Sequence, residues 1–310
     1  MITRLTQLAE LVKSSGRRYR IAIAWAQDSN SIGALFKGVC DGFLEAVLIG
    51  KKPEIIKACE KENIDYSGLN IIESASDYEA CRRAVDMARS GEADIVMKGL
   101  VGTDRFLKAV MDKETGLMEP GATLSYVCAL DIPAYRKLLF ITDPAVIPFP
   151  DLEQKIAMTR YAIEMAGRFG ITKPRIALIG ATEKISRHFQ SSLDYSVMCK
   201  MAERGQLPDC IMDGPVDIFL ACDPKSPEIK NVRTVLEGDA DILVFPSIES
   251  CNPFYKGLML FAGAELAGLI CGTVKPVVLM SRNESLLSKY YCIALACMMT
   301  KSSNNQTQMK

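Results

Sequence analysis

Two short apolar runs of this 310-residue chain end abruptly at polar side chains, residues 242–245 (ILVF) and residues 277–280 (VVLM). The second run is followed directly by Ser281 and Arg282. A guanidinium group can bind phosphate through two hydrogen bonds at once, and a hydroxyl group can donate to an oxygen that gains negative charge during a reaction. This pair of side chains could therefore serve chemistry on a phosphate-containing substrate.

Polar residues follow other apolar runs in the same way. They are Lys98, Gly99, Thr103, Asp143, Glu183, Asp213, Ser247, Glu249, Asn252 and Lys256. Lys98 could neutralise a phosphate, while Asn252 and Lys256 stand one turn apart on one face of a predicted helix. The alternative interpretation is that these are ordinary loops, in which Lys98 is solvated, Thr103 caps a helix and Asp213 serves a Gly–Pro turn.

Strand and helix patterns alternate along the chain. We predict strands at residues 19–26, 46–49, 70–72, 94–97, 138–141, 175–179, 210–212, 242–245 and 277–280. We predict helices at the N-terminus, through Leu35 and Val39, and at residues 53–62, 77–89, 151–169, 193–203, 254–267 and 286–299. This alternation indicates βαβ units and a parallel sheet, and ligands bind beyond the carboxyl ends of such strands. We therefore expect residues 247–256 and 281–282 to line one crevice.

Composition excludes several classes of protein. Lys and Arg together number 37, as do Asp and Glu, so the net charge of zero argues against nucleic-acid binding. No apolar run approaches the ~18–20 residues of a membrane-spanning helix. The 11 cysteines form no C-x-x-C pair, which is typical of reduced thiols in a cytoplasmic protein. Cys251 lies in the predicted crevice, and we expect it to pack there as a small apolar residue rather than to act as a nucleophile.

Familiar catalytic motifs are missing from the sequence. There is neither a G-x-G-x-x-G nor a G-x-x-x-x-G-K-[ST] loop, which disfavours a nucleotide site of the Rossmann or P-loop type. His188 is the single histidine, so a histidine-rich metal site or a Ser–His–Asp triad would depend on it. We expect this histidine to be exposed or lightly packed.

Over nearly its whole length, from about Arg20 to Ala296, the sequence resembles the phosphate acetyltransferase/phosphate butyryltransferase family, and its butyryl branch most closely. The segments that carry the resemblance are residues 93–117, 124–127 (LSYV), 138–146 (LLFITDPAV), 150–155 (PDLEQK), 173–178 (KPRIAL), 211–218 (IMDGPVDI), 238–256 and 276–285 (PVVLMSRNES). Each is weak alone, whereas their order and spacing together are highly specific.

The resemblance implies the reaction acyl-CoA + phosphate ⇌ acyl phosphate + CoA, without a metal or other cofactor. It implies an α/β fold of two domains like isocitrate and isopropylmalate dehydrogenases, with mainly parallel sheets and the site in the cleft between them. With a soft border near residues 134–137, we predict domain I at residues 1–137 plus 284–310 and domain II at 138–283. A homodimer or larger homo-oligomer in the cytoplasm is expected.

Residue roles also follow from the resemblance. Ser281 and Arg282 would assist at the thioester and the phosphate, and Glu284 stands nearest to the position of the family's aspartate base. Glu284 could equally be a helix N-cap or a first-turn carboxylate. The predicted substrate-binding residues are Lys98, Gly99, Thr103, Ser125, Asp143, Glu183, Asp213, Asn252 and Lys256.

Three segments depart from the family pattern: Tyr126 replaces a histidine, residues 144–150 (PAVIPFP) replace a Met- and Asn-rich stretch, and Ser186 replaces an asparagine. These departures keep open a second hypothesis, a non-catalytic sensor of acyl-CoA or acyl phosphate on the same fold. A third, a 2-hydroxy acid dehydrogenase, would need a cluster of aspartates for a divalent metal, and the sequence shows none.

Overall fold

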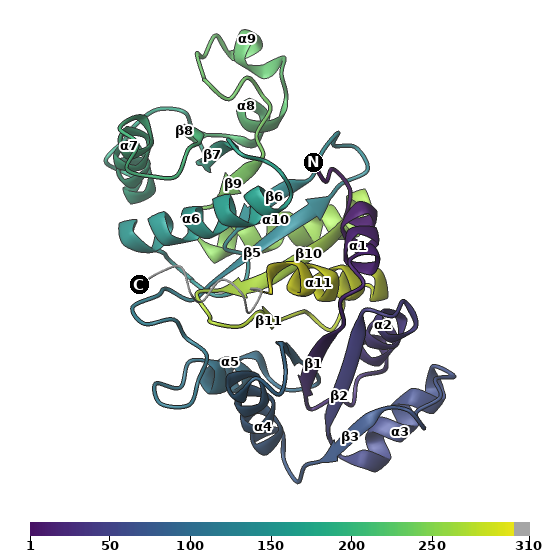
Figure 1. The fold of residues 1–310 in the computed structure, drawn as a ribbon. Helices are drawn as coiled ribbons and strands as arrows, with labels where there is room; N and C mark the ends of the chain where they lie inside the picture. The colour runs from purple at the N-terminus through teal and green to yellow at the C-terminus, as the bar shows by residue number, and fades with distance from the viewer. Residues whose placement is uncertain (301–310) are drawn as a thin grey trace. The chain divides into compact units, whose positions relative to one another are not determined.

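The computed structural model describes residues 1–300, and contacts divide the chain into two compact units (Figure 1). The middle unit contains residues 1–5 and 123–266, and the terminal unit contains residues 6–122 and the described residues from 267 onward. The sequence from Thr300 onward (TKSSNNQTQMK) predicts a polar, frayed tail, and of this tail only Thr300 lies within the described residues. Among residues 1–300, no helix is both long and apolar enough to cross a membrane.

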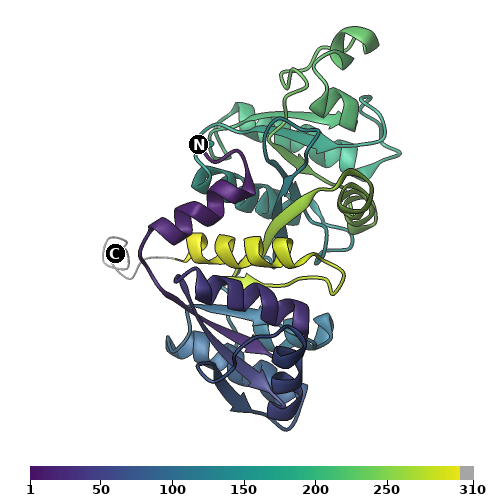
Figure 2. The same ribbon diagram turned by 90° about the vertical axis from the view of Figure 1, so that its right-hand side faces the viewer.

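The terminal unit is a mostly parallel sheet with helices, in the strand order β3-β2-β1-β4-β11-β10. Its elements are most of α1 (Leu5–Ser14), β1 (Tyr19–Ala24), α2 (Ser29–Cys40), β2 (Leu44–Gly50), α3 (Lys52–Lys61), β3 (Asn70–Glu73), α4 (Asp77–Ser90), β4 (Ile95–Lys98), α5 (Thr103–Val110), most of β10 (Glu265–Cys271), β11 (Val277–Val278) and α11 (Leu286–Met299). Helix α2 lies beside α11, and α4 packs against α5 (Figure 2).

The middle unit has the strand order β5-β6-β9-β7-β8. Its elements are β5 (Ser125–Asp131), β6 (Leu139–Thr142), α6 (Leu152–Arg168), β7 (Arg175–Ile179), α7 (Gln190–Glu203), β8 (Ile211–Val216), α8 (Ile218–Cys222), α9 (Ser226–Lys230), β9 (Ile242–Val244) and α10 (Ile248–Ala262). Strands β6, β9, β7 and β8 run parallel, as predicted. Buried aromatic rings of Phe140 and Phe169 meet edge-on in its core, 5.2 Å between centroids.

The boundaries of the two units differ from the predicted domain boundaries. Pairing of β5 with β6 assigns residues 123–137 to the middle unit. Pairing of β11 with β4 assigns residues 267–283 to the terminal unit. In the first place β5 joins the next strand along the chain, whereas in the second β11 joins a strand that is distant in sequence.

Helix ends follow their local sequence signals. Asp151 and Gln154 form a reciprocal capping box at the start of α6. Ser76 accepts a hydrogen bond from the Glu79 N–H at the start of α4, and Gly91 ends that helix with a φ of 86°. The predicted helix at residues 77–89 is therefore confirmed to within one residue, and the helix at 286–299 coincides with α11.

Two predictions about elements were wrong. The helix predicted at residues 254–267 begins earlier, as α10 at Ile248, and ends before Gly263, whose φ of 63° stops it. The residues beyond it form β10, whose apolar sequence resembled a continuing helix. Strand β5 was not predicted, and β5 and β10 each pair antiparallel with one neighbour, β6 and β11 respectively.

Candidate functional site

The carboxyl ends of three strands lie side by side in the terminal unit. β1 pairs in parallel with β4 up to Ala24 and Lys98, and β11 pairs in parallel with β4 up to Val278. The segments that follow these strands meet at one edge of the sheet, which is where the sequence predicted ligand-binding groups. A Cβ atom at Gly99 would collide with backbone oxygen atoms at the end of β1, so only glycine fits this close approach.

A small pocket lies at this edge, and we name it the Lys98 pocket. It is lined by Asp28, Ser31, Lys98, Gly99, Leu100, Met280, Ser281, Arg282 and Lys289. The structure thus brings together four of the predicted site residues, Lys98, Gly99, Ser281 and Arg282. Three cationic side chains and one carboxylate line the pocket, so its charge favours an anionic ligand.

Lys98 is the buried cation at the end of β4. Its exposed fraction is 6%, which contradicts the alternative of a solvated lysine. The ammonium group donates to the carbonyl oxygens of Gly99 and Val101, at 3.2 Å each. Burial lowers the pKa of Lys98, and the positive charges of Arg282 and Lys289 lower it further. Nearby carboxylates oppose this shift without cancelling it.

Sequence reasoning missed Asp28, Ser31 and Lys289. The Asp28 carboxylate caps α2 by accepting from the backbone N–H of Ser31 at 3.0 Å, and it accepts from the Lys289 ammonium at 3.0 Å. Burial disfavours the charged carboxylate, but hydrogen bonds from Ser31 and Lys289 outweigh it and hold the pKa of Asp28 below its ordinary value. One signal was available, because Lys289 is the single charged residue within the apolar α11 sequence.

The segment between β11 and α11 carries the predicted catalytic residues. Ser281 is half-buried, Arg282 is exposed and Glu284 is buried at 7% exposure. Ser285 is the N-cap of α11, so Glu284 precedes the cap and the alternative of an N-cap or first-turn role for it was wrong. The alternative for Thr103 was also wrong, since Gly102 caps α5 and Thr103 is its exposed first residue.

In the middle unit, three predicted residues surround the turn after β6. The buried Asp143 carboxylate accepts from Ser125 Oγ at 3.0 Å and from the backbone N–H groups of Tyr126, Ala145 and Val146 at 2.8–3.0 Å. Burial raises the pKa of Asp143, against the opposite effect of these hydrogen bonds. The Asn252 side chain donates to the Pro144 carbonyl oxygen at 2.8 Å. This network orders the turn at residues 143–146.

The remaining predicted residues lie elsewhere in the middle unit. Glu183 is 3.8 Å from Lys230, whose ammonium also contacts Asp217, and Asp213 accepts from Thr234 Oγ1 at 2.7 Å. Lys256 is exposed on α10. Because Ser247, Glu249, Asn252 and Lys256 belong to the middle unit, whereas Ser281 and Arg282 belong to the terminal unit, no single unit contains the predicted crevice.

Two predictions about single residues are confirmed. His188 is exposed. Cys251 is fully buried, and burial raises the pKa of its thiol well above the ordinary value, which suits packing rather than nucleophilic attack. Within residues 1–300, no group of three or more His, Cys, Asp or Glu side chains is arranged to hold a metal ion.

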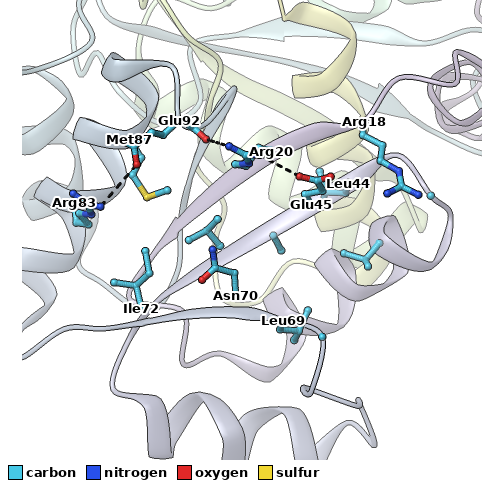
Figure 3. Close-up of a pocket in the computed structure, with 15 residues that line it drawn as sticks. Arg18, Arg20, Leu44, Glu45, Leu69, Asn70, Ile72, Arg83, Met87 and Glu92 are labelled. Carbon is cyan, nitrogen blue, oxygen red and sulfur yellow. Dashed lines mark hydrogen bonds and ion pairs between the residues drawn. The ribbon is translucent and has the colours of Figure 1, made fainter.

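A larger groove of about 740 Å³ lies near the amino ends of β1 and β2, also in the terminal unit (Figure 3). Arg18, Arg20, Arg83, Glu45 and Glu92 surround it, and we name it the arginine groove. Arg20 pairs with Glu45 at 3.5 Å and Arg83 with Glu92 at 3.8 Å. The exposed ion pairs and the position near the amino ends distinguish this groove from the Lys98 pocket.

Comparisons with known proteins match most of the chain. The family model described as "Phosphate acetyl/butaryl transferase" matches residues 77–297. A phosphate butyryltransferase from Clostridium beijerinckii is 36% identical over 279 residues, which cover 90% of this chain and 92% of the relative. A phosphate acetyltransferase from Thermotoga maritima is 33% identical, with 94% and 98% of the two chains covered. The crystal structure of a branched-chain phosphotransacylase from Enterococcus faecalis superposes with a TM-score of 0.78 at 26% identity, covering 91% of this chain and all of the other.

Proposed function

Because this chain belongs to the phosphate acetyl/butaryl transferase family, we propose that it transfers a short acyl group between CoA and inorganic phosphate. Acyl-CoA and phosphate would react directly in a ternary complex to give acyl phosphate and CoA. Butyryl-CoA is the proposed acyl donor, since the butyryltransferase named above is 36% identical to this chain. The site needs no metal or other cofactor in this proposal.

The observation that carries the proposal is the convergence of Lys98, Ser281 and Arg282 on one pocket. Arg282 can bind phosphate with two prongs, and Lys98 adds a second positive charge. Ser281 can donate to the thioester carbonyl oxygen as it becomes negative, an effect worth about 3–4 kcal/mol where such donors are removed from other enzymes. Holding both anionic substrates together supplies a further part of the acceleration.

Several finer statements belong to the same proposal. They are a two-domain fold like that of isocitrate and isopropylmalate dehydrogenases, a homodimer or larger homo-oligomer, and a cytoplasmic location. Glu284 is retained as a candidate base toward the CoA thiol. Six residues of the middle unit are retained as candidates for substrate binding, directly or by ordering the turn at residues 143–146: Ser125, Asp143, Glu183, Asp213, Asn252 and Lys256.

The test is phosphate-dependent release of CoA from acetyl-, propionyl-, butyryl- and branched acyl-CoA by the purified protein, followed with a thiol reagent. We expect release that requires phosphate and is fastest with butyryl-CoA. A ranking with another acyl-CoA first would correct the chain length alone. Tight binding of acyl-CoA without any release of CoA would contradict the enzymatic function and support the hypothesis of a non-catalytic sensor.

A further inference from the structure

Lys98 differs from the other two cations of the Lys98 pocket in what surrounds it. Lys289 has a carboxylate partner in Asp28 at 3.0 Å, and Arg282 is exposed to solvent. Lys98 is 6% exposed, and its ammonium group donates to two neutral carbonyl oxygens. Within residues 1–300, no carboxylate forms an ion pair with it. The pocket thus holds a buried amine whose hydrogen-bond acceptors are neutral, while the carboxylates of Asp28 and Glu284 act on it through space.

Titratable and charged groups act on Lys98 from four neighbouring segments. They are Arg282 and Glu284 from the segment after β11, Lys289 from α11, Asp28 at the start of α2 and Cys81 from α4. Burial raises the pKa of Cys81 to about 12, so this thiol stays neutral. Burial and the two cations together lower the pKa of Lys98 despite the two carboxylates. The same surroundings would not make an arginine lose its proton, because the guanidinium group stays protonated in proteins.

The proposed reaction needs a group that carries a proton. The hydrogen phosphate dianion has one hydrogen, whereas the acyl phosphate dianion has none and the CoA product has a thiol. One proton must therefore move from phosphate to sulfur while a C–O bond forms and the C–S bond breaks. Asp28 does not suit this task, because its lowered pKa keeps it ionised.

We propose that Lys98 is a catalytic residue that carries this proton between phosphate and the CoA sulfur. In the direction of acyl phosphate, the Lys98 ammonium donates a proton to the sulfur as the C–S bond breaks, and the neutral amine takes the proton from the attached phosphate. In the reverse direction, the neutral amine accepts the thiol proton as sulfur attacks the acyl carbon. This inference rests on the proposed function and assigns to Lys98 the proton of the CoA thiol, the role for which Glu284 is the competing candidate.

Lysine-to-arginine substitution separates the two roles. In Lys98→Arg the positive charge stays in the pocket, but the guanidinium does not give up its proton. A purely electrostatic role predicts a variant with nearly normal turnover. Proton transfer predicts a loss of about 10²–10⁴-fold in kcat, with smaller changes in the KM of acyl-CoA and phosphate.

The experiment measures CoA release from the best acyl-CoA between pH 6 and 10 for the wild type, Lys98→Arg, Lys98→Met and Glu284→Gln. The exposed Lys108 of α5 provides the matched control, Lys108→Arg. The wild-type rate should fall as pH rises through the pKa of Lys98, below the ordinary value of about 10.4, because the ammonium form is the donor. This alkaline decline should persist in Lys108→Arg and Glu284→Gln and vanish from both Lys98 variants.

Three results would overturn the inference while leaving the proposed function intact. They are a wild-type rate without the alkaline decline, a Lys98→Arg variant within a few-fold of the wild-type kcat, or a decline that is lost in Glu284→Gln instead. If thermal unfolding shows that Lys98→Arg does not fold, the inference is tested by the pH dependence of CoA release in the wild type and in Lys98→Met. A wild type that releases no CoA at any pH would end the proposed function and this inference together.

Discussion

The Lys98 pocket and the arginine groove lie in the same unit. Each region has three cationic side chains and two carboxylates in it or close to it. The pocket has Lys98, Arg282 and Lys289 with Asp28 and the nearby Glu284. The groove has Arg18, Arg20 and Arg83 with Glu45 and Glu92. Charge counts alone would therefore rank these two regions as equal.

Burial separates them. The paired side chains Arg20, Glu45, Arg83 and Glu92 are 48–54% exposed, so water and salt screen their charges. In the pocket, Lys289 has a side-chain exposure of 2% and Lys98 is also buried. The same charge acts more strongly where the effective dielectric constant is lower. The comparison teaches that two buried cations, Lys98 and Lys289, distinguish the proposed anion site from the larger hollow, whereas its third cation, Arg282, is exposed.

The largest expected difference concerns catalysis. Arg282→Ala should lower kcat/KM for phosphate by about 10³-fold, which lies within the range of losses seen when one partner of a desolvated, hydrogen-bonded charge pair is removed. Arg18→Ala in the arginine groove should have a kcat/KM for phosphate within a few-fold of the wild-type value. Steady-state CoA release at several phosphate concentrations measures both. A comparable loss of kcat/KM in Arg18→Ala would indicate that the arginine groove, not the Lys98 pocket, binds the anion.

A smaller difference is expected in stability. Lys289→Met leaves the Asp28 carboxylate without its 3.0 Å partner, which should cost about 3 kcal/mol in the free energy of unfolding. Arg83→Met, which breaks the exposed pair with Glu92, should stay within about 0.5 kcal/mol. Urea unfolding at pH 7 measures both values. Equal losses of unfolding free energy in the two variants would show that burial does not distinguish the two regions.

The smallest effect concerns acid stability. Because the pKa of Asp28 is lowered in the folded protein, its ionised form stabilises the fold above the unfolded pKa of about 3.9, and this contribution is lost as pH falls through the folded value. Asp28→Asn keeps a residue suited to the N-cap but removes the titration. Between pH 5 and 3 the wild type should thus lose more unfolding free energy than Asp28→Asn. Parallel losses would exclude Asp28 as an ionised partner of Lys289.

Sequence patterns predicted the parts of the site that depend on local order. The continuous apolar run before Ser281 revealed β11, and the run before Lys98 revealed β4, so both polar ends were found. The Asp28–Lys289 pair was missed because its members are 261 residues apart and only the packing of α2 against α11 brings them together. Strand β10 was missed because its apolar sequence follows α10 closely and resembles a continuation of that helix. Strand β5 was missed because its apolar residues do not reveal by their own pattern which partner strand they will meet.

The most direct measurement is the binding of inorganic phosphate itself, by calorimetric titration of the wild type, Arg282→Ala and Arg18→Ala. We predict that the wild type and Arg18→Ala bind phosphate with similar affinity and that Arg282→Ala binds it at least tenfold more weakly, a change of about 1.4 kcal/mol. Equal affinity of all three proteins would contradict the claim that the buried cations of the Lys98 pocket and Arg282 form the phosphate site.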